Sequence, residues 1–300
     1  MDAYKRILKS QKIRFAILRA MKIVPDRMML KLQYRVKFGR KLNLRTPERF
    51  TEKIQCYKLA YKNELMPVCS DKYAVREYVT AKGLAHILID LYNVFESPDE
   101  ICFDALPEKF VMKLSNGSGT NLICKDKNEL DAKQVIRQFK WYKKKVKANA
   151  GREWPYMQAK PVIIVEKLLE DSSRINNMPN DYKIFCYNGK PSYVICISDR
   201  YSDQCNHLVY DTEWKKVNVA SEGARLEEDI ERPENLQDML EIAAKLSEDF
   251  PFARIDLYSV KGNIYFGEIT FYPWSGYMEF EPDEFDFVLG EKFDIGRGRR

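Results

Sequence analysis

The residues best suited to chemistry lie in one stretch near the end of the chain, which reads PFARIDLYSVKGNIYFGEITFYPWSGY from Pro251. Apolar and polar residues alternate on both sides of Lys261-Gly262-Asn263, and this alternation predicts two strands joined by a turn. If the turn is a three-residue loop centred on Gly262, Asp256 and Glu268 lie directly opposite each other on one face of the hairpin. If it is a two-residue loop, the register slips and Glu268 leaves that face.

Two carboxylates that face each other across a sheet repel, and natural sheets avoid this pairing. A divalent cation between Asp256 and Glu268 would remove the repulsion, and hard oxygen ligands suit Mg²⁺. Arg254 and Thr270 fall on the same face in the three-residue register, beside the two acids. The pattern therefore favours a metal site on the hairpin. The alternative is a solvated hairpin with ordinary surface charges.

A second group of residues has the types that bind phosphate. The run from Phe110 to Leu114 reads as a strand, and Asn116-Gly117-Ser118-Gly119-Thr120 follows it at once. The backbone amides of such a glycine loop can point at an anion, while Lys113 supplies a positive charge from rigid backbone. The order differs from that of the Walker A loop, because the lysine precedes the glycines. Taken alone, the loop is also typical of an ordinary turn.

Two further strands carry candidate residues. The buried run VIIVEKLL, which ends at Leu169, offers backbone groups that could pair with the edge of an adenine ring, although the same run is typical of a core strand. Asp181 and Lys183 alternate with Tyr182 along the next strand, so both side chains reach one face. The alternative for this pair is an exposed position on an edge strand.

These candidates need a framework of strands and helices. The dipeptide Asn188-Gly189 predicts a hairpin turn between two strands over 181–198. Thr46-Pro47-Glu48 predicts the start of a helix. Further helices are expected over 4–24, 71–83, 128–147 and 233–250. Further strands are expected over 87–95, 110–114 and 161–169, and in a short segment through Cys124.

The composition bounds the class of protein. The chain has 300 residues, of which 45% are hydrophobic, enough for a substantial core. It contains no apolar run of about 18 residues, so we expect no transmembrane helix, and its N-terminus lacks the apolar core of a signal peptide. Seven cysteines are scattered without a C-x-x-C pair, which favours free thiols in a reducing cytoplasm. The two histidines, His86 and His207, are too few for a histidine-based metal site.

The net charge of +6 conceals a basic N-terminal segment. Residues 1–45 hold 14 Lys and Arg against two Asp, a net of +12, which leaves a net of −6 for the rest of the chain. A basic arm on an acidic body points to an anionic partner for the arm and argues against nucleic-acid binding by the body. The arm could lie on an anionic membrane surface. Alternatively, its apolar residues pack on the body while its lysines are solvated.

Taken in chain order, these motifs resemble those of the ATP-grasp fold. They run from Asp71-Lys72 through Lys113 and its glycine loop, Glu166-Lys167-Leu168-Leu169 and Asp181-Tyr182-Lys183 to Arg254-x-Asp256 and Glu268-x-Thr270. The stretches FGRKLNLRTPERFTEKIQ, SDKYAVREYV and EITFYPWSGY are similar, more narrowly, to the TupA-like ATP-grasp family. That family is associated with teichuronopeptide and other bacterial surface-polysaccharide biosynthesis. The resemblance extends from about Tyr34 to Leu289.

The resemblance implies an α+β fold in which two α/β lobes clasp ATP behind a basic helical N-terminal segment. It places this segment at residues 1–70, a lobe with a glycine-rich lid at 71–169, and a lobe with the metal-binding hairpin at 170–300. The backbone of Glu166, Lys167, Leu168 and Leu169 would hold adenine, and Asp181 the ribose hydroxyls. The phosphates of ATP would contact Lys72, Lys113, Ser115, Gly117, Ser118 and Gly119.

The resemblance also implies a chemistry. Lys183 would face the phosphates, and Arg254 would stabilise charge on the transferring phosphoryl group. Asp256, Glu268 and, less tightly or through water, Thr270 would hold Mg²⁺; the family usually has Asn in place of this threonine. The implied reaction is cytoplasmic and joins a carboxylate, such as a uronic acid of a glycan, to an amine or amino acid through an acyl phosphate. A kinase on the same fold and a glycosyltransferase of a polysaccharide locus are the alternatives.

Overall fold

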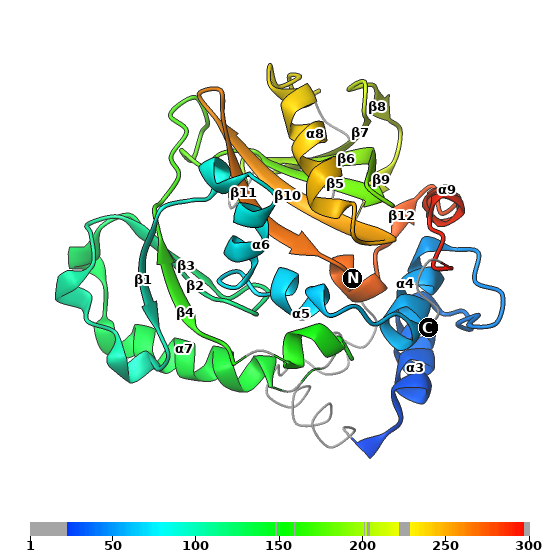
Figure 1. Ribbon diagram of the computed structural model, residues 1–300, viewed down its shortest axis with the longest axis horizontal. Helices are drawn as coiled ribbons and strands as arrows, with labels where there is room; N and C mark the ends of the chain where they lie inside the picture. The colour runs from blue at the N-terminus through cyan, green and yellow to red at the C-terminus, as the bar shows by residue number, and fades with distance from the viewer. Residues whose placement is uncertain are drawn as a thin grey trace.

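The computed structural model describes residues 23–147, 149, 151–158, 160–200, 202, 205–221 and 229–296 (Figure 1). Its strands form two larger antiparallel sheets with helices around and between them, which confirms the α+β class. The helix expected over 4–24 lies outside the described residues, apart from its last two positions. In the described part of the chain, no helix has both the length and the hydropathy needed to span a membrane.

The helices are α3 (Asp26–Phe38), α4 (Phe50–Ala60), α5 (Leu65–Ser70), α6 (Val75–Ala81), α7 (Ala132–Val146), α8 (Leu236–Ser247) and α9 (Phe285–Lys292). The strands are β1 (Leu91–Phe95), β2 (Phe110–Leu114), β3 (Asn121–Cys124), β4 (Ile163–Glu166), β5 (Asp181–Tyr187), β6 (Lys190–Ser198), β7 (Asn206–Asp211), β8 (Lys216–Val217), β9 (Ala220–Ser221), β10 (Phe252–Val260), β11 (Asn263–Thr270) and β12 (Phe280–Glu281).

The smaller of the two sheets supports the glycine loop and has the strand order β1-β4-β2-β3. Successive residues of a strand point to opposite faces. Phe110 and Met112 of β2 therefore enter the core under α7, and Lys113 lies on the opposite face. Helix α7 begins at Ala132, four residues after the predicted start at 128, because Asp131 accepts a hydrogen bond from the amide of Gln134 and residues 127–129 form a separate 3₁₀ turn. Strand β1 is shorter than predicted, since the chain before it forms a 3₁₀ turn.

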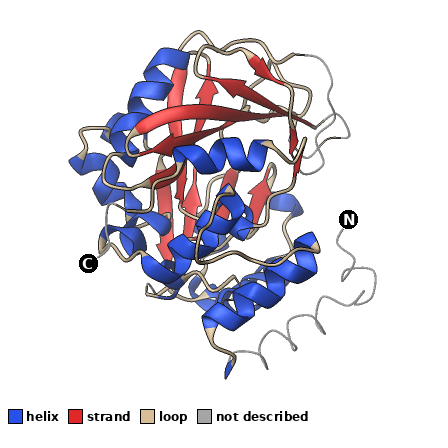
Figure 2. Ribbon diagram, turned by 90° about the vertical axis from the view of Figure 1, so that its right-hand side faces the viewer, coloured by secondary structure: helices blue, strands red, loops and turns tan. Residues whose placement is uncertain are grey.

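The larger sheet has the strand order β11-β10-β5-β6-β7-β8 and carries the hairpin with the two acids. Strands β5 and β6 turn at Asn188-Gly189, as predicted, and both residues have the positive φ that a type I′ turn requires, 50° and 76°. Helix α8 packs against one face of β10, β5 and β6 through side chains such as Met239 and Leu246. Figure 2 shows the helices gathered along one side of the strands and below them.

Helices α5 and α6 lie between the two sheets in Figure 1 and pack in the core of the larger one. The helix predicted over 71–83 is regular only from Val75. The Asp71 side chain accepts hydrogen bonds from the amides of Tyr73 and Ala74, at 2.9 and 3.0 Å, and closes a turn there. Lys72 therefore projects from a turn in front of the helix, and its own amide donates to the Ser115 carbonyl at 2.8 Å.

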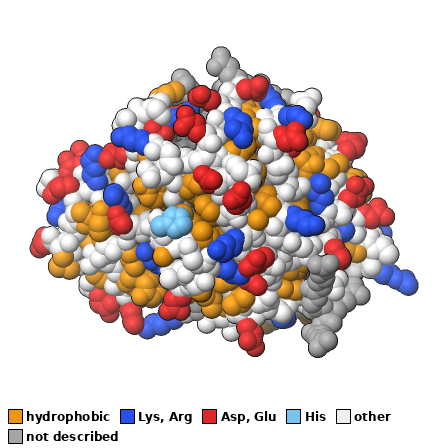
Figure 3. Space-filling view, turned by 45° about the horizontal axis from the view of Figure 1, so that its top comes forward, with side chains coloured by type: hydrophobic (Ala, Val, Ile, Leu, Met, Phe, Trp, Pro, Cys, Tyr) orange, Lys and Arg blue, Asp and Glu red, His pale blue; other side chains and the backbone are white. Residues whose placement is uncertain are grey.

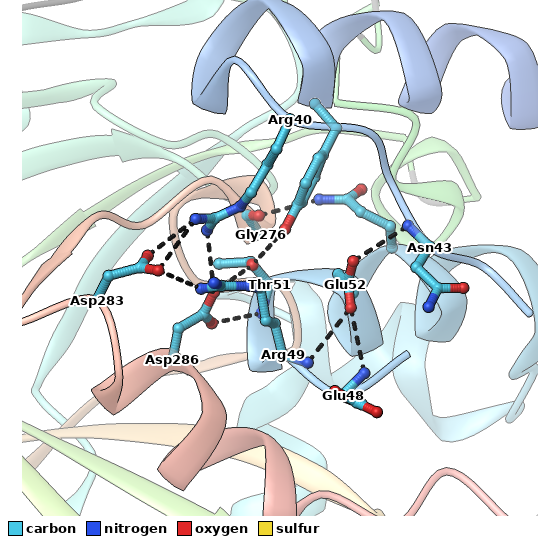
Figure 4. A network of polar contacts seen from close by, with 11 residues as sticks. Arg40, Asn43, Glu48, Arg49, Thr51, Glu52, Gly276, Asp283 and Asp286 are labelled. Atoms are coloured by element: carbon cyan, nitrogen blue, oxygen red, sulfur yellow. Dashed lines mark hydrogen bonds and ion pairs between the residues drawn. The ribbon is translucent and has the colours of Figure 1, made fainter. Parts of the chain in front are cut away.

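Helix α4 begins at Phe50, so the predicted start at Thr46 is wrong. The Glu52 carboxylate accepts hydrogen bonds from the amides of Asn43 and Glu48, both at 3.1 Å, and closes the intervening residues into a loop (Figure 4). Because the Glu52 side chain accepts hydrogen bonds from these amides, the segment before Phe50 satisfies them without forming a helix.

A buried aspartate joins α4 to the last helix, α9. Asp286 accepts hydrogen bonds from the amide and the hydroxyl of Thr51, at 2.9 and 2.7 Å, and lies 3.4 to 3.5 Å from the guanidinium nitrogens of Arg40 and Arg49 (Figure 4). Both arginines also pair with Asp283. The stretch FGRKLNLRTPERFTEKIQ thus forms the contact between the N-terminal helices and the C-terminal end of the chain.

The hairpin of β10 and β11 pairs its two acids as predicted, but its turn differs from the predicted one. The turn has two residues, Lys261 and Gly262, with φ of 49° and 79°, so the predicted three-residue loop is wrong. A β-bulge at Gly267 adds one residue to β11 and corrects the register. Asp256 therefore still lies opposite Glu268, as predicted.

The surface carries charges of both signs. On the face shown in Figure 3, acidic and basic side chains are interspersed with hydrophobic ones. A surface of this kind produces no extended field of one sign over that face.

Replacement of Gly267 by valine should destabilise the protein, by about 1–3 kcal/mol, the usual cost of overpacking. A Cβ at this position would lie 2.9 Å from the Asp256 carbonyl oxygen and 3.1 Å from the Tyr258 ring. Deletion of Gly267 should instead keep Asp256 opposite Glu268, because it removes the bulge and leaves the two-residue turn. Urea unfolding of both variants is the measurement, and a Gly267→Val protein as stable as the wild type would contradict this geometry.

Candidate active site

Four buried ionic side chains lie side by side on β5 and β10. The Arg254 guanidinium contacts both oxygens of Asp256, at 2.6 and 2.7 Å. Lys183, directly opposite Asp256 on the neighbouring strand, reaches the same carboxylate at 2.5 Å and that of Asp181 at 2.8 Å. All four are buried. The alternation that sends Asp181 and Lys183 to one face is as predicted, and the pair is central in the sheet, not on an edge.

Strand β11 adds an acid and a hydroxyl to this group. Arg254 lies 3.4 Å from Oε1 of Glu268 and 3.1 Å from the hydroxyl of Thr270. The Thr270 hydroxyl also bonds to Glu268, at 3.2 Å. The Glu268 side chain is 33% exposed, against 3% for that of Asp256, so Glu268 is the carboxylate more open to an incoming ligand.

Lysine 72 links the hairpin to the glycine loop. The Lys72 ammonium lies 3.0 Å from Oε2 of Glu268 and donates a hydrogen bond to the Gly117 carbonyl, also at 3.0 Å. Burial raises the pKa of Glu268, but the charges of Lys72 and Arg254 lower it by more, so the pKa lies far below its ordinary value. Glu268 is therefore an anion at every physiological pH.

The positive charge of Arg254 is equally secure. Burial alone would lower the pKa of Arg254, but the Asp256 carboxylate raises it by more, and Glu268 adds to this effect. The site therefore presents a permanent guanidinium between two carboxylates, the arrangement in which charge on a transferring group can be stabilised without prior reorganisation.

The glycine loop is anchored at its start and open at its tip. Ser115 donates a hydrogen bond from its hydroxyl to Asp71, at 2.6 Å, and is buried, whereas Ser118 and Gly119 are exposed. A side chain at Gly117 would come within 2.5 Å of the Thr120 hydroxyl, so glycine is required there. The hydroxyl of Thr120 is buried and has no hydrogen-bond partner within the described residues.

Lys113 belongs to a second ionic group, on the smaller sheet. Its ammonium lies 2.6 Å from Oε2 of Glu166, and Arg76 of α6 lies 3.6 Å from the other oxygen. Glu166 ends β4, so the strand predicted as far as Leu169 is too long. The pairing with β1 continues only as far as the Lys167 amide, which donates to the carbonyl of Asp90, the residue before β1. Leu168 is buried and Leu169 half-buried beyond it.

Several contributors to the site were given no role from the sequence, although Asp71 stands in the first of the motifs. Asp71 anchors both the Lys72 turn and Ser115, and Arg200 lies 2.7 Å from the Asp181 carboxylate. Asp71 carried a usable signal, since Ser70-Asp71-Lys72 is typical of a helix start. Arg76 and Arg200 carried none, because a single arginine in a helix or after a strand is typical of any surface.

A buried lysine on α4 fixes the turn that follows β11. The Lys58 ammonium donates hydrogen bonds to the carbonyls of Gly151 and Ser275, both at 2.8 Å, and to the Ser275 hydroxyl at 2.9 Å. Trp274 and Ser275 both have positive φ, 46° and 57°, a conformation that needs support from its surroundings. The Trp274 ring lies 5.2 Å from the Arg254 guanidinium. Helix α4 thus holds an aromatic ring beside the ionic group.

One sheet bears Lys113 and the glycine loop, and the other bears the hairpin with Arg254, Asp256 and Glu268. This pair of sheets defines an ATP-grasp protein. The family model described as TupA-like ATPgrasp matches residues 52–294, and the chain belongs to this family. The match includes every predicted site residue, α4 from Glu52 onward and the Trp274 turn; it starts later than the expected Tyr34 and extends past Leu289. No curated protein matches the chain.

Solved structures with a similar fold include three of stated activity. D-alanine–D-alanine ligase from Bacillus anthracis, complexed with ATP, has 16% identity and a TM-score of 0.42, over 70% of this chain and 58% of the ligase. D-cycloserine synthetase DcsG has 13% identity and a TM-score of 0.44, over 76% and 70% of the two chains. The ATP-grasp ligase PsnB, complexed with a minimal precursor, Mg and ADP, has 14% and 0.38, over 84% and 64%. The chain thus spans less than two thirds of the first and third of these proteins.

We expect the free energy of unfolding of the wild type to rise, relative to that of Lys58→Met, as the pH increases from 8 to 10.5. Burial lowers the pKa of Lys58 to about 8, from an ordinary value of 10.5, and Glu153 opposes this only weakly from 3.8 Å. In this interval the unfolded lysine holds a proton that the folded one has released, so unfolding becomes less favourable as the pH rises.

Over the full interval, the pKa shift of Lys58 corresponds to a difference of about 3 kcal/mol in the free energy of unfolding. Urea unfolding of both proteins at several pH values measures it. Curves that stay parallel would show that Lys58 keeps its ordinary pKa in the folded state.

Proposed function

We propose that the chain is an ATP-dependent carboxylate–amine ligase that acts in the cytoplasm in bacterial surface-polysaccharide biosynthesis. The observation that carries the proposal is the group formed by Asp256, Glu268, Arg254, Lys183 and Lys72, in which acids and cations alternate on adjoining strands and a turn. Phosphoryl transfer needs charge neutralisation and positioning more than a covalent residue of the protein. Family membership supports the use of ATP.

The oxygen donors of the site fit Mg²⁺ that is bound jointly by the protein and by a triphosphate. Asp256 and Glu268 are paired across two strands and Thr270 adds a hydroxyl, all oxygen donors of the kind Mg²⁺ prefers. The described residues contain no cluster of three or more His, Cys, Asp or Glu suited to a metal. Phosphate oxygens would therefore complete the coordination. When bound, the ion would neutralise phosphate charge as the phosphoryl group is transferred.

The cations of the group have a role once phosphates arrive. Arg254 and Lys183 occupy both oxygens of Asp256; a bound triphosphate offers them a second set of negative charges. Lys72 and the exposed tip of the glycine loop, Ser118 and Gly119, would cover the phosphates from the other side. We assign adenine to the backbone from the last residue of β4 onward, residues 166–169. We assign the ribose hydroxyls to Asp181, whose Oδ1 is buried and has no hydrogen-bond partner in the described chain.

The proposed reaction has two steps. A substrate carboxylate oxygen attacks the γ-phosphorus, ADP leaves, and an acyl phosphate forms. The amine nitrogen then attacks the acyl carbon, phosphate leaves, and the nitrogen loses a proton to give the amide. Arg254 would stabilise charge on the phosphoryl group in the first step. Residues 71–169 and 170–300 would act as the two lobes, and closure of the loop after Lys113 would exclude water from the acyl phosphate.

The sequence supports two further parts of the proposal. The family's association with surface polysaccharides points to a uronic acid of a glycan as the carboxylate and an amine or amino acid as the second substrate. The excess of Lys and Arg over residues 1–45 supports peripheral contact of this segment with an anionic membrane surface.

Mg²⁺ with ATP, at a hundred times its dissociation constant, should stabilise the wild type against unfolding by about 2.7 kcal/mol. Glu268→Gln should lose most of this stabilisation and all turnover yet remain folded, because its side chain is partly exposed. The matched control is Glu234→Gln, at an exposed position, which should behave as the wild type. Thermal unfolding with and without ligand measures the effect; full activity in Glu268→Gln would contradict the hairpin site.

ADP release with a uronic-acid-containing acceptor should require an amine and yield an amide. Trp274→Ala should raise the KM for the acceptor several-fold, because the ring lies beside Arg254 where the carboxylate would be held. Mass spectrometry of the product is the second readout. A stable phosphorylated acceptor formed without amine would identify a kinase instead, and stabilisation by a nucleotide sugar but not by ATP would identify a glycosyltransferase.

A further inference from the structure

The outer side of helix α3 carries a row of apolar side chains in contact with solvent. Met28, Leu32 and Val36 are 63%, 48% and 49% exposed, and Ile23 in front of the helix is 91% exposed. Residues four apart lie above one another on a helix, so Met28, Leu32 and Val36 form one continuous stripe. In Figure 1, α3 lies at the edge of the molecule, beyond α4.

A basic stripe runs beside the apolar one. Arg27, Lys31 and Arg35 each precede a member of the apolar stripe by one residue, and all three are exposed. Within the described residues, none of them has an acidic partner, whereas Lys37 on the inner side pairs with Glu279 at 3.0 Å. We refer to these two stripes, of three residues each, as the outer face of α3.

The outer face is fixed in its orientation because the inner face is firmly held. Met29, Leu30 and Tyr34 are buried, and the Tyr34 hydroxyl lies 2.9 Å from that of Thr51 on α4. Gln33 accepts a hydrogen bond from the Tyr277 hydroxyl at 2.8 Å. Rotation of α3 to bury the apolar stripe would expose these side chains and break both contacts.

We propose that the outer face of α3 binds the surface of an anionic lipid bilayer. An apolar stripe beside a basic one matches the boundary between acyl chains and anionic headgroups. A water-soluble polyanion would satisfy the basic stripe alone. The preceding residues 1–22 carry seven Lys and Arg and one Asp, and a second copy presents the same basic stripe, so both would be repelled by Arg27, Lys31 and Arg35.

This inference rests on the membrane contact in the proposed function and locates it on particular residues. It also has a consequence for the acceptor. Tyr277, bonded to α3 through Gln33, ends the turn that contains Trp274. A bilayer bound to the outer face would therefore lie on the opposite side of α3 from this turn, about 10–12 Å away, a distance that a lipid-linked glycan can span.

Sedimentation of the full chain with vesicles tests the proposal. On vesicles of equal parts phosphatidylglycerol and phosphatidylcholine, Met28→Ser/Leu32→Ser/Val36→Ser and Arg27→Gln/Lys31→Gln/Arg35→Gln should each bind at least about tenfold more weakly than the wild type. The matched control removes the same charge from the exposed side of α7, with Lys133→Gln/Arg137→Gln/Lys140→Gln, and should bind as the wild type. Added salt should weaken binding of the wild type, and pure phosphatidylcholine should bind little.

A further full-chain variant separates this inference from the proposed function, with glutamine at the seven basic positions 5, 6, 9, 12, 14, 19 and 22. If only this variant loses binding, the membrane contact stands and its assignment to α3 is wrong. If the wild type does not bind vesicles, both are wrong. If the serine variant turns a dimer into a monomer without changing vesicle binding, the outer face of α3 joins copies of the chain instead.

Discussion

The contact between Arg254 and Asp256 is the constraint on which the rest of the site depends. A carboxylate that is 3% exposed must be paired to remain charged, so strand β5 has to supply Lys183 opposite Asp256, and β11 has to bring Glu268 to Arg254. Buried ion pairs of this kind add little net stability compared with apolar side chains. Their concentration on three adjacent strands is therefore better explained by the phosphoryl chemistry that we propose for them.

The bulge at Gly267 follows from the same constraint. A type I′ turn suits the twist of the hairpin, but in a regular ladder it would place Gly267, not Glu268, opposite Asp256. One extra residue in β11 reconciles the turn with the pairing of the two acids, and only glycine fits against the Asp256 carbonyl. The turn preference is thus met at Lys261-Gly262, and the pairing of the two acids is met by the bulge at Gly267.

Helix α4 connects the site to the N-terminal helices and to the C-terminal end of the chain. The amide of Thr51, at its start, donates a hydrogen bond to Asp286. Gln55 donates hydrogen bonds to the carbonyls of Ser275 and Gly276, and Lys58 donates one to the Ser275 carbonyl. The two stretches FGRKLNLRTPERFTEKIQ and EITFYPWSGY therefore meet in space. These contacts fix the turn that carries the Trp274 ring, which lies 5.2 Å from the Arg254 guanidinium.

The sequence by itself determined the local features: the Asn188-Gly189 hairpin, the common face of Asp181 and Lys183, the glycine loop after Lys113, and the family. Each depends on alternation, a turn dipeptide or the order of motifs, all of which are local. Only the tertiary structure decided the bulge at Gly267 and the contacts of Lys72 with Glu268 and of Lys58 with Ser275. The bulge is needed because the two-residue turn alone would put Asp256 and Glu268 out of register. The contacts join segments far apart in the chain, and packing, which no local pattern encodes, brings those segments together.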